Sequence, residues 1–301
     1  MQVGINGQTV AEERATVPIL SHAMSRGSTI FEVLDLVATP RGRAIFRAGA
    51  HAERFLCGAE ALHMELPLDA AEFVEAMKAT VRANGLERGG IKAFAYWGEP
   101  EMALIPHNLR ASVAIFCYDF ERALGVSWND LRKPASACVT SIGRARAAAG
   151  TAQTKAAGNY VTGMLARWEA VGKGADDAIL LDDTGHLAEG PLSSVFVVRG
   201  GVVRTARLDG VLAGVTRDSV IAVTRALGIA LEETDVPGEE LAAVDEAFYT
   251  GTHIRVKPIR SIDGRSLAPC PGPVTARIQQ ALEAAYDGAD ARYAEWLDYV
   301  E

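Results

Sequence analysis

The sequence is poor in the residues that build metal sites and disulfide frameworks. It has 4 cysteines and 6 histidines among 301 residues. The cysteines form no C-x-x-C pair, and the dispersed histidines form no recognisable ligand pair. We therefore expect no metal site, and free thiols in a cytoplasmic protein. The cysteines are Cys57, Cys117, Cys138 and Cys270.

Long apolar runs and basic clusters are also absent. No apolar stretch approaches the length that crosses a bilayer, and the start, MQVGINGQTVAEER, lacks the basic and then apolar pattern of a secretory signal. A net charge of -8 without a polybasic tail disfavours nucleic acid as the main partner, because that binding rests on phosphate neutralisation. With 49% hydrophobic and 23% charged residues, the composition is that of a folded globular protein that binds small molecules and no membrane.

Apolar periodicity predicts an α/β organisation in two domains. We expect a small N-terminal α/β domain over 1–122, a linker over 123–134 and a larger domain over 135–301. Asn6-Gly7 is the signal of a tight hairpin turn. Helical spacing covers 50–62, 70–83, 160–171, 216–227 and a stretch from 274. Strand character covers 28–34, 44–46, 91–97, 112–116, 137–142, 178–181, 194–198 and 246–249.

Lys155 stands alone in a stretch of small residues, RARAAAGTAQTKAAGNY over 144–160. A lysine that forms a Schiff base must lose its proton, and burial among small uncharged neighbours favours the neutral amine. The alternative is a surface lysine in a flexible alanine-rich loop. Composition alone favours this alternative.

Three further segments are compatible with a bound anionic cofactor. Glu189 precedes a Gly-Pro bend and is either a partner for a pyridine nitrogen or a solvated turn residue. The stretch 212–218 predicts a glycine loop that leads into a helix with Thr216 as N-cap, where backbone N–H groups favour phosphate; a simple capped helix is the alternative. Thr250-Gly251-Thr252 offers small hydroxyl donors, and Arg54 is either a phosphate clamp or a surface arginine.

In this order and spacing, the motifs resemble the branched-chain amino acid aminotransferases, which are class IV aminotransferases of pyridoxal 5'-phosphate (PLP) fold type IV. Each motif is weak alone, but their order along nearly the whole chain is specific. The matching positions are Ser21-His22-Ala23, Phe31-Glu32, His51 with Arg54, Lys155 with 157–160, Glu189-Gly190, 214–218, 250–252 and 272–275.

The resemblance implies a D-amino-acid-aminotransferase-like fold with a C-terminal pseudo-barrel domain, and a homodimer or higher homo-oligomer. It implies that Lys155 holds the cofactor as a Schiff base and later moves the substrate proton. Glu189 would pair with the pyridine nitrogen and Tyr160 with the ring hydroxyl. The implied phosphate ligands are Arg54, Thr252 and the backbone amides of Val215 and Thr216.

The implied reaction moves an amino group from a branched-chain or other apolar L-amino acid to a 2-oxo acid such as 2-oxoglutarate. Two departures from the family pattern concern the substrate side. The usual F-E-G-[IVL]-R is FEVLD over 31–35, and the usual Tyr-x-Arg aligns with Gly90-Ile91-Lys92. Lys92 offers a cation without the arginine fork. The predicted substrate residues are Phe31, Lys92, Thr252 and His253, and Tyr96, Trp97 and Met102 are pocket or core residues.

The cofactor motifs leave other functions open. A D-amino-acid or (R)-amine transaminase, or a 4-amino-4-deoxychorismate lyase, would use the same lysine and glutamate. A catalytically inactive binding protein with this fold is the alternative from another class. Assays with L- and D-amino donors separate the first group, and protein that stays colourless with PLP would indicate the last.

Overall fold

The structure is a computed structural model that describes residues 1–145 and 153–301. The predicted small-residue loop at 146–152 therefore lies outside the described residues. The chain divides into two compact units. The first unit is Met1–Val126, Thr154–Gly158 and Ala285–Glu301, and the second is Ser127–Gln153 and Asn159–Ala284. The functional domain boundaries given above stay a prediction.

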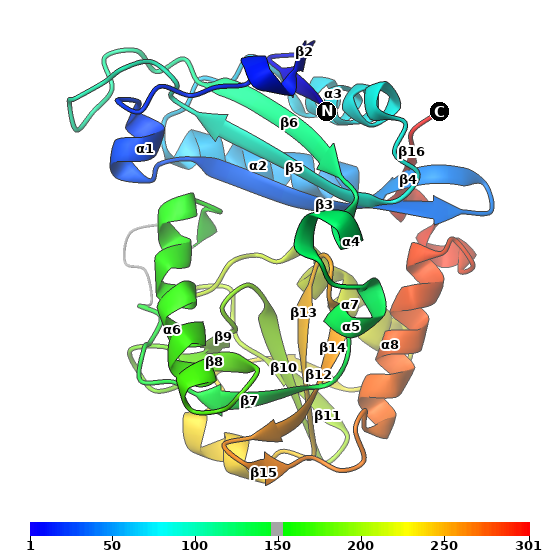
Figure 1. Ribbon diagram of the computed structural model, residues 1–301. Coiled ribbons are helices and arrows are strands. Elements are labelled where there is room, and N and C mark those ends of the chain that lie inside the picture. The colour runs from blue at the N-terminus through cyan, green and yellow to red at the C-terminus, as the bar shows by residue number, and fades with distance from the viewer. Residues whose placement is uncertain (146–152) are drawn as a thin grey trace. The chain divides into compact units, whose positions relative to one another are not determined.

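The first unit is built on an antiparallel sheet of seven strands (Figure 1). The strand order is β16-β4-β3-β5-β6-β1-β2. Asn6 and Gly7 have positive φ between β1 and β2, which confirms the predicted turn. The strands are β1 Gln2–Ile5, β2 Gln8–Ala11, β3 Ile30–Thr39, β4 Gly42–Phe46, β5 Gly89–Tyr96, β6 Ser112–Tyr118 and β16 Leu297–Tyr299.

Helices α2 Ala48–Ala61 and α3 Ala70–Asn84 cover one face of this sheet (Figure 1). Strand alternation turns Ile30, Leu34 and Leu36 toward the helices, where all three are fully buried. Asp69 and Glu72 form a capping box that fixes the start of α3. The opposite face of β3 and β5 contains Phe31 and Phe94, and these two helices do not cover it.

Two short helices lie within or next to the predicted linker at 123–134. They are α4 Phe120–Leu124 and α5 Trp128–Leu131. The side chains of Asp119 and Ser127 accept the free N–H groups at the helix starts, so each helix is specified by its cap rather than by apolar periodicity. A third short helix, α1 His22–Arg26, begins after Ser21 in the same way.

The sheet of the second unit closes on itself. Its order is β12-β11-β10-β13-β14-β7-β8-β9, and β9 also pairs with β10. The path from β10 through β13, β14, β7, β8 and β9 therefore returns to β10, which confirms the predicted pseudo-barrel. The strands are β7 Ala135–Val139, β8 Asp177–Leu181, β9 Leu187–Glu189, β10 Ser194–Arg199, β11 Val202–Thr205, β12 Leu231–Glu233, β13 Glu246–Gly251, β14 Arg255–Ile262 and β15 Arg265–Ser266.

Three longer helices belong mainly to the second unit. They are α6 Tyr160–Gly172, α7 Val215–Ala226 and α8 Pro273–Tyr286, which ends in the first unit. The described helices include none that is both long and apolar enough to span a membrane.

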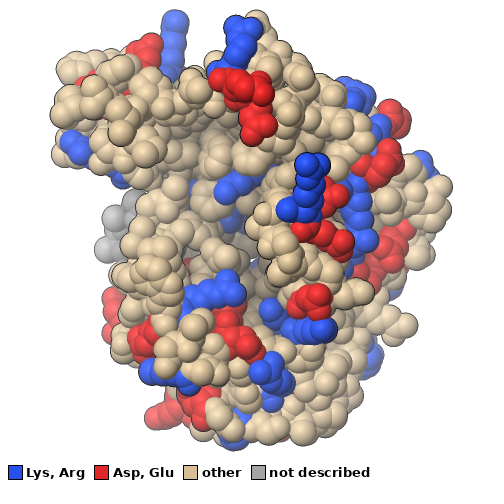
Figure 2. Space-filling view, in the orientation of Figure 1, with Lys and Arg blue, Asp and Glu red and all other residues tan. Residues whose placement is uncertain are grey.

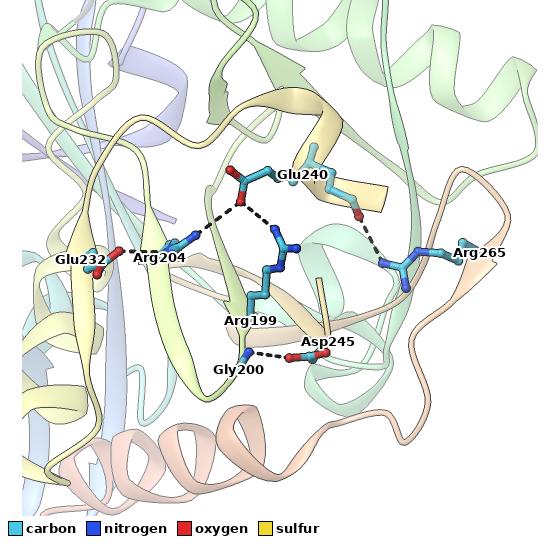
Figure 3. Close-up of polar contacts among 8 residues, drawn as sticks. Arg199, Gly200, Arg204, Glu232, Glu240, Asp245 and Arg265 are labelled. Atoms are coloured by element: carbon cyan, nitrogen blue, oxygen red, sulfur yellow. Dashed lines mark hydrogen bonds and ion pairs between the residues drawn. The ribbon is translucent and has the colours of Figure 1, made fainter. Parts of the chain in front are cut away.

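Ion pairs hold the 3-10 helix at Gly238–Ala243 against the barrel. Glu240 contacts Arg199 at 3.2 Å and Arg204 at 3.4 Å, and Arg204 also pairs with Glu232 (Figure 3). These side chains are partly exposed, so they add little stability individually and serve mainly to fix the connection between β12 and β13.

One predicted strand, at 137–142, ends earlier than expected, at Val139. The carboxylate of Asp263 accepts the Val139 N–H, and the Thr140 hydroxyl donates to the carbonyl of Ile142. The Thr140 N–H still donates to the Ile179 carbonyl of β8, but the Ile142 carbonyl is occupied by a side chain, and regular pairing ends before it.

Candidate active site

Backbone pairing holds Lys155 against the start of β3. The Phe31 N–H donates to the Lys155 carbonyl at 3.0 Å, and the Ala157 N–H donates to the Thr29 carbonyl at 2.8 Å. Ile30 and Ala156 form an antiparallel bridge between these two bonds. The Lys155 Nζ lies 4.7 Å from the centre of the Phe31 ring. The lysine backbone is therefore fixed by main-chain bonds, and its amine faces an aromatic ring.

A second lysine contacts the same ring. The Lys92 Nζ lies 5.3 Å from the centre of the Phe31 ring and 5.1 Å from that of Phe94. Phe31 and Phe94 are cross-strand partners, so both rings lie on the sheet face that α2 and α3 do not cover. Burial lowers the pKa of Lys92. Within residues 1–145 and 153–301, no carboxylate forms an ion pair with this ammonium group.

Further along this face, Tyr118 covers the backbone of Gly90. The two residues are cross-strand partners, and a Cβ atom added to Gly90 would overlap the Tyr118 ring. Asp35, which pairs with Gly90 from the other side, is 1% exposed. Burial and the nearby Asp35 raise the pKa of Tyr118 to about 12. Val33, Asp35 and Gly90 stand where the resemblance leads us to expect glycine, arginine and tyrosine. All three therefore lie on the same face of the sheet as Lys92.

Beneath β3, Glu32 joins two side chains of α2. The Arg54 Nε donates to Oε1 of Glu32 at 2.7 Å, and the Arg54 Nη2 donates to Oε2 at 2.7 Å. The His51 Nδ1 lies 2.7 Å from the same Oε2. The Glu32 side chain is 0% exposed and that of Arg54 12%. Arg54 is therefore a half-buried residue in a two-point ion pair, not an ordinary surface arginine.

The three side chains differ in charge. Burial opposes the charge of Glu32, but Arg54 and His51 outweigh it and hold the carboxyl pKa well below its ordinary value. Burial lowers the pKa of His51, and the charges of Arg54 and Lys155 lower it further, against the opposing effect of Glu32. At neutral pH, Glu32 is thus ionised and His51 is neutral, so its Nδ1–H donates to the carboxylate.

In the second unit, one row across the barrel connects Glu189 with the Thr250-Gly251-Thr252 segment. Ser194 of β10 pairs with Glu189 of β9 on one side and with Thr250 of β13 on the other. The Thr250 side chain is buried, and its Oγ1 has no hydrogen-bond partner in the part of the chain that the structure describes. A polar atom in this state is uncommon in native proteins and marks a place where a ligand can bind.

The start of α7 lies beside the same row. A Cβ atom added to Gly214 would stand 3.1 Å from the Ser194 Oγ, so the glycine allows close approach. Gly214, and not Thr216, is the N-cap, and it makes no side-chain cap bond. The prediction for Thr216 was wrong because the helix begins before that residue, at Val215. The first intrahelical bond is that of the Asp218 N–H, so the amides of Val215 and Thr216 precede it.

Other predicted residues also belong to the second unit. The Glu189 Oε1 is 3.1 Å from the Nε of Arg144, so the two side chains form an ion pair. Tyr160 opens α6, after a turn of 3-10 helix at Ala157–Asn159. The His253 ring lies edge-on to Trp128, at 5.6 Å between ring centres.

The predicted residues therefore form two groups, one in each unit. The group of the first unit contains Phe31, Arg54, Lys92 and Lys155, and that of the second contains Tyr160, Glu189, Val215, Thr216, Thr252 and His253. The three further aromatic or sulfur residues do not join the first group as a pocket. Trp97 belongs to the helix-covered core, Tyr96 lines a cavity of about 670 Å³ with Glu65 and Arg110, and Met102 is 75% exposed.

Our sequence analysis assigned no role to Glu32, His51 or Arg144. A signal for the first two was present, because each interrupts an otherwise apolar buried face. Glu32 stands between Ile30 and Leu34 on β3, and His51 stands between Ala48 and Ala52 on α2. Nothing local in the sequence indicates the Arg144–Glu189 pair, because the two residues are far apart in the chain.

The buried state of His51 predicts a pH-dependent stability. Its folded-state pKa lies below the ordinary value of 6.5, so the unfolded chain binds more protons between these values and stability rises with pH. The contribution is complete above 6.5 and is lost as the pH falls toward the folded-state pKa. We expect the wild type to lose more stability than His51→Asn between about pH 7.5 and about pH 5.5, measured by urea denaturation.

His63→Asn is the matched control, because His63 is exposed and its φ of 59° suits asparagine. It should keep the pH dependence of the wild type. Equal slopes for the wild type and His51→Asn would contradict the burial of a neutral His51.

Known proteins resemble this chain over its full length. The family model for amino-transferase class IV matches residues 29–262. The branched-chain-amino-acid aminotransferase of Pseudomonas aeruginosa strain PAO1 is 33% identical over 297 residues, which cover 98% of this chain and 96% of that protein. The predictions of a fold type IV enzyme and of an aminotransferase are confirmed at the level of the family.

Solved structures agree with this result. The branched-chain aminotransferase of Thermoproteus uzoniensis with norvaline has a TM-score of 0.94 and 35% identity, with 100% of this chain and 99% of that chain covered. The branched-chain amino acid aminotransferase of Thermobaculum terrenum, in its PLP form, has a TM-score of 0.91 and 30% identity, with 100% and 98% covered. This chain therefore belongs to the class IV aminotransferases, in the branched-chain amino acid aminotransferase family.

Proposed function

We propose that the protein is a PLP-dependent transaminase that moves an amino group from an apolar L-amino acid, such as a branched-chain one, to a 2-oxo acid such as 2-oxoglutarate. The observation that carries this proposal is the setting of Lys155. Main-chain bonds fix it beside Phe31, and its charge acts on the His51 of the Glu32–Arg54 cluster. Of the two solved relatives, one is a structure with norvaline and the other is in a PLP form, so their ligands are of the expected classes.

The residues of both units fit the chemistry of this cofactor. Arg54 is a cation whose guanidinium plane is fixed. The amides of Val215 and Thr216 stand at a helix start, where the dipole favours anions. The buried Thr250 Oγ1 lies in the same row as Glu189 and offers an additional donor. Each of these groups, and the Thr252 hydroxyl, is of a kind that binds phosphate.

When bound, PLP supplies an aldehyde that combines with amines and a ring that withdraws electrons from the substrate α-carbon. Lys155 would provide the amine that holds the cofactor, and the same amine would serve as the base for the α-proton. Glu189, which pairs with Arg144 at 3.1 Å, would be the partner of the ring nitrogen, and Tyr160 would be that of the ring hydroxyl. These roles follow the family resemblance and the geometry of each unit.

For the substrate, we infer that Lys92 binds a carboxylate and that Phe31 borders the apolar side chain. The half-buried ammonium of Lys92 has no carboxylate of its own in the described chain, and an anion would offset the cost of its burial. Thr252 and His253, in the turn that connects β13 with β14, are the further substrate residues that we propose.

We infer further that the protein is a cytoplasmic homodimer or a higher homo-oligomer. One face of α6 exposes Val161, Met164, Leu165, Trp168 and Val171, between 42% and 65% each. In the region of α6, Figure 2 shows a mainly tan surface in the upper part and charged side chains toward the lower end. An exposed apolar stripe at helical spacing is typical of a surface that another protein covers, and a second copy of this chain is the partner that the resemblance implies.

Removal of the Lys155 amine tests the proposed function. In Lys155→Ala, we expect transamination to fall by about 10³-fold or more, because both covalent attachment and proton transfer are lost. Borohydride reduction of the wild type with PLP should modify the peptide that contains Lys155, as read by mass spectrometry. Lys133→Ala, at a side chain that is 71% exposed, should keep activity and labelling. Labelling elsewhere in the wild type would defeat the proposal.

The role of Lys92 predicts a split between kinetic constants. Lys92→Met loses a charge-assisted bond, which corresponds to an increase of about tenfold or more in the KM of the carboxylate substrate. The value of kcat should change less, and Lys133→Met should change neither. A panel of L- and D-amino donors, each with 2-oxoglutarate, identifies the substrate concerned. An unchanged KM for every donor and acceptor would exclude Lys92 from substrate binding.

The apolar face of α6 predicts a charge-sensitive assembly. Trp168→Glu places a charge in the middle of the stripe, and we expect it to shift the protein toward monomers in sedimentation velocity, because a buried unpaired charge is strongly unfavourable. Leu124→Glu, at a residue that is 56% exposed on α4, is the control and should leave the assembly unchanged. A wild type that is monomeric at every concentration would contradict the proposal.

A further inference from the structure

We propose that Glu32 is a positioning residue for the cofactor phosphate, acting through Arg54. This inference rests on the proposed function. Glu32 is fully buried, so it cannot touch a ligand that enters from solvent without a rearrangement. Its carboxylate instead contacts the side chain that we propose as a phosphate ligand.

The geometry of the pair fixes the guanidinium plane. Glu32 binds Arg54 side-on, through Nε and Nη2 at 2.7 Å each. Because the guanidinium is planar, the Nη1 group lies on the side opposite to the carboxylate. A two-point contact on a rigid plane stops rotation about the last side-chain bonds of Arg54. An anion that binds the outer edge then meets a group that is already oriented, and less side-chain freedom is lost on binding.

His51 completes the arrangement by holding the carboxylate. Its Nδ1 lies 2.7 Å from the Glu32 Oε2, the atom that also accepts from the Arg54 Nη2. His51 is 2% exposed, and its neutral state adds no charge to the pair. A lysine or arginine in its place would add a second cation beside Lys155. The histidine thus orients Glu32 while the pair keeps a net charge of zero.

The alternative is that Glu32 contributes only to stability. Breaking a buried ion pair by removing one partner is strongly destabilising, so a loss of activity alone would not separate the two roles. The separation requires two ligands that differ only in the phosphate. Pyridoxal and PLP meet this condition. The dissociation constant of pyridoxal divided by that of PLP, called the ratio below, measures what the phosphate contacts contribute to binding.

The experiment measures this ratio by absorbance titration of apo-protein, for the wild type, Glu32→Asp and Glu53→Asp. Glu32→Asp keeps the charge but is too short for the side-on contact. Glu53 is exposed on the same helix as Arg54 and provides the matched control. We expect Glu32→Asp to lose on the order of tenfold in the ratio through weaker PLP binding, with pyridoxal binding unchanged. Glu53→Asp should retain the ratio of the wild type.

Glu32→Gln is the second variant, for the case that Glu32→Asp does not fold. It keeps the side-chain length but presents an amide NH₂ to one guanidinium nitrogen. The loss of a negative charge would by itself strengthen anion binding, so a smaller ratio in this variant must come from orientation. In an Arg54→Ala background, neither Glu32 variant should change the ratio further.

Three outcomes would overturn the inference. The first is an unchanged ratio in the Glu32 variants, whether both ligands bind normally or both bind more weakly. The second is a larger ratio in Glu32→Gln, which would show that Glu32 acts by its charge. The third, a wild type that takes up neither ligand at Lys155, would defeat the proposed function as well, and so differs from a failure of the inference alone.

Discussion

The hydrogen bonds between the segment before β3 and residues 155–158 are the constraint on which the first group of site residues depends. They return a distant part of the chain to the first unit, so that Lys155 lies beside Phe31. The same strand carries Glu32, whose carboxylate orients Arg54 from below. Strand β3 therefore contributes to both faces of the sheet. Phe31 contacts Lys155 on one face, and Glu32 holds Arg54 on the other. Strand alternation alone makes this division possible.

Much of this arrangement follows from the sequence, because the relevant signals are local. The turn at Asn6-Gly7, the helices over 48–61 and 70–84, and the glycine loop before α7 each depend on nearby residues. The family resemblance adds the order of the motifs, and the comparisons confirm the family and the barrel fold. The roles of Lys155 and Glu189 in this chain stay predictions.

What the sequence could not provide depends on long-range pairing. Strand β14 contains Pro258 and was not predicted, yet it lies between β13 and β7 in the barrel. β16 is three residues long and gains its order from antiparallel pairing with β4. The cap of α7 was placed at Thr216 because side-chain caps are the usual rule, whereas the close approach of Gly214 to Ser194 decides the start. Tertiary contacts, and not the local sequence, thus determine the pairing of β14 and β16 and the start of α7.

The packing of Tyr118 on Gly90 limits the substitutions that are possible at these two positions. Gly90 has no side chain over its backbone, and the ring of Tyr118 from the neighbouring strand occupies that space. A side chain added at 90 would collide with that ring, and truncation at 118 alone would leave a void over bare backbone. The two positions are thus mutually dependent, and a larger side chain at 90 requires a smaller one at 118.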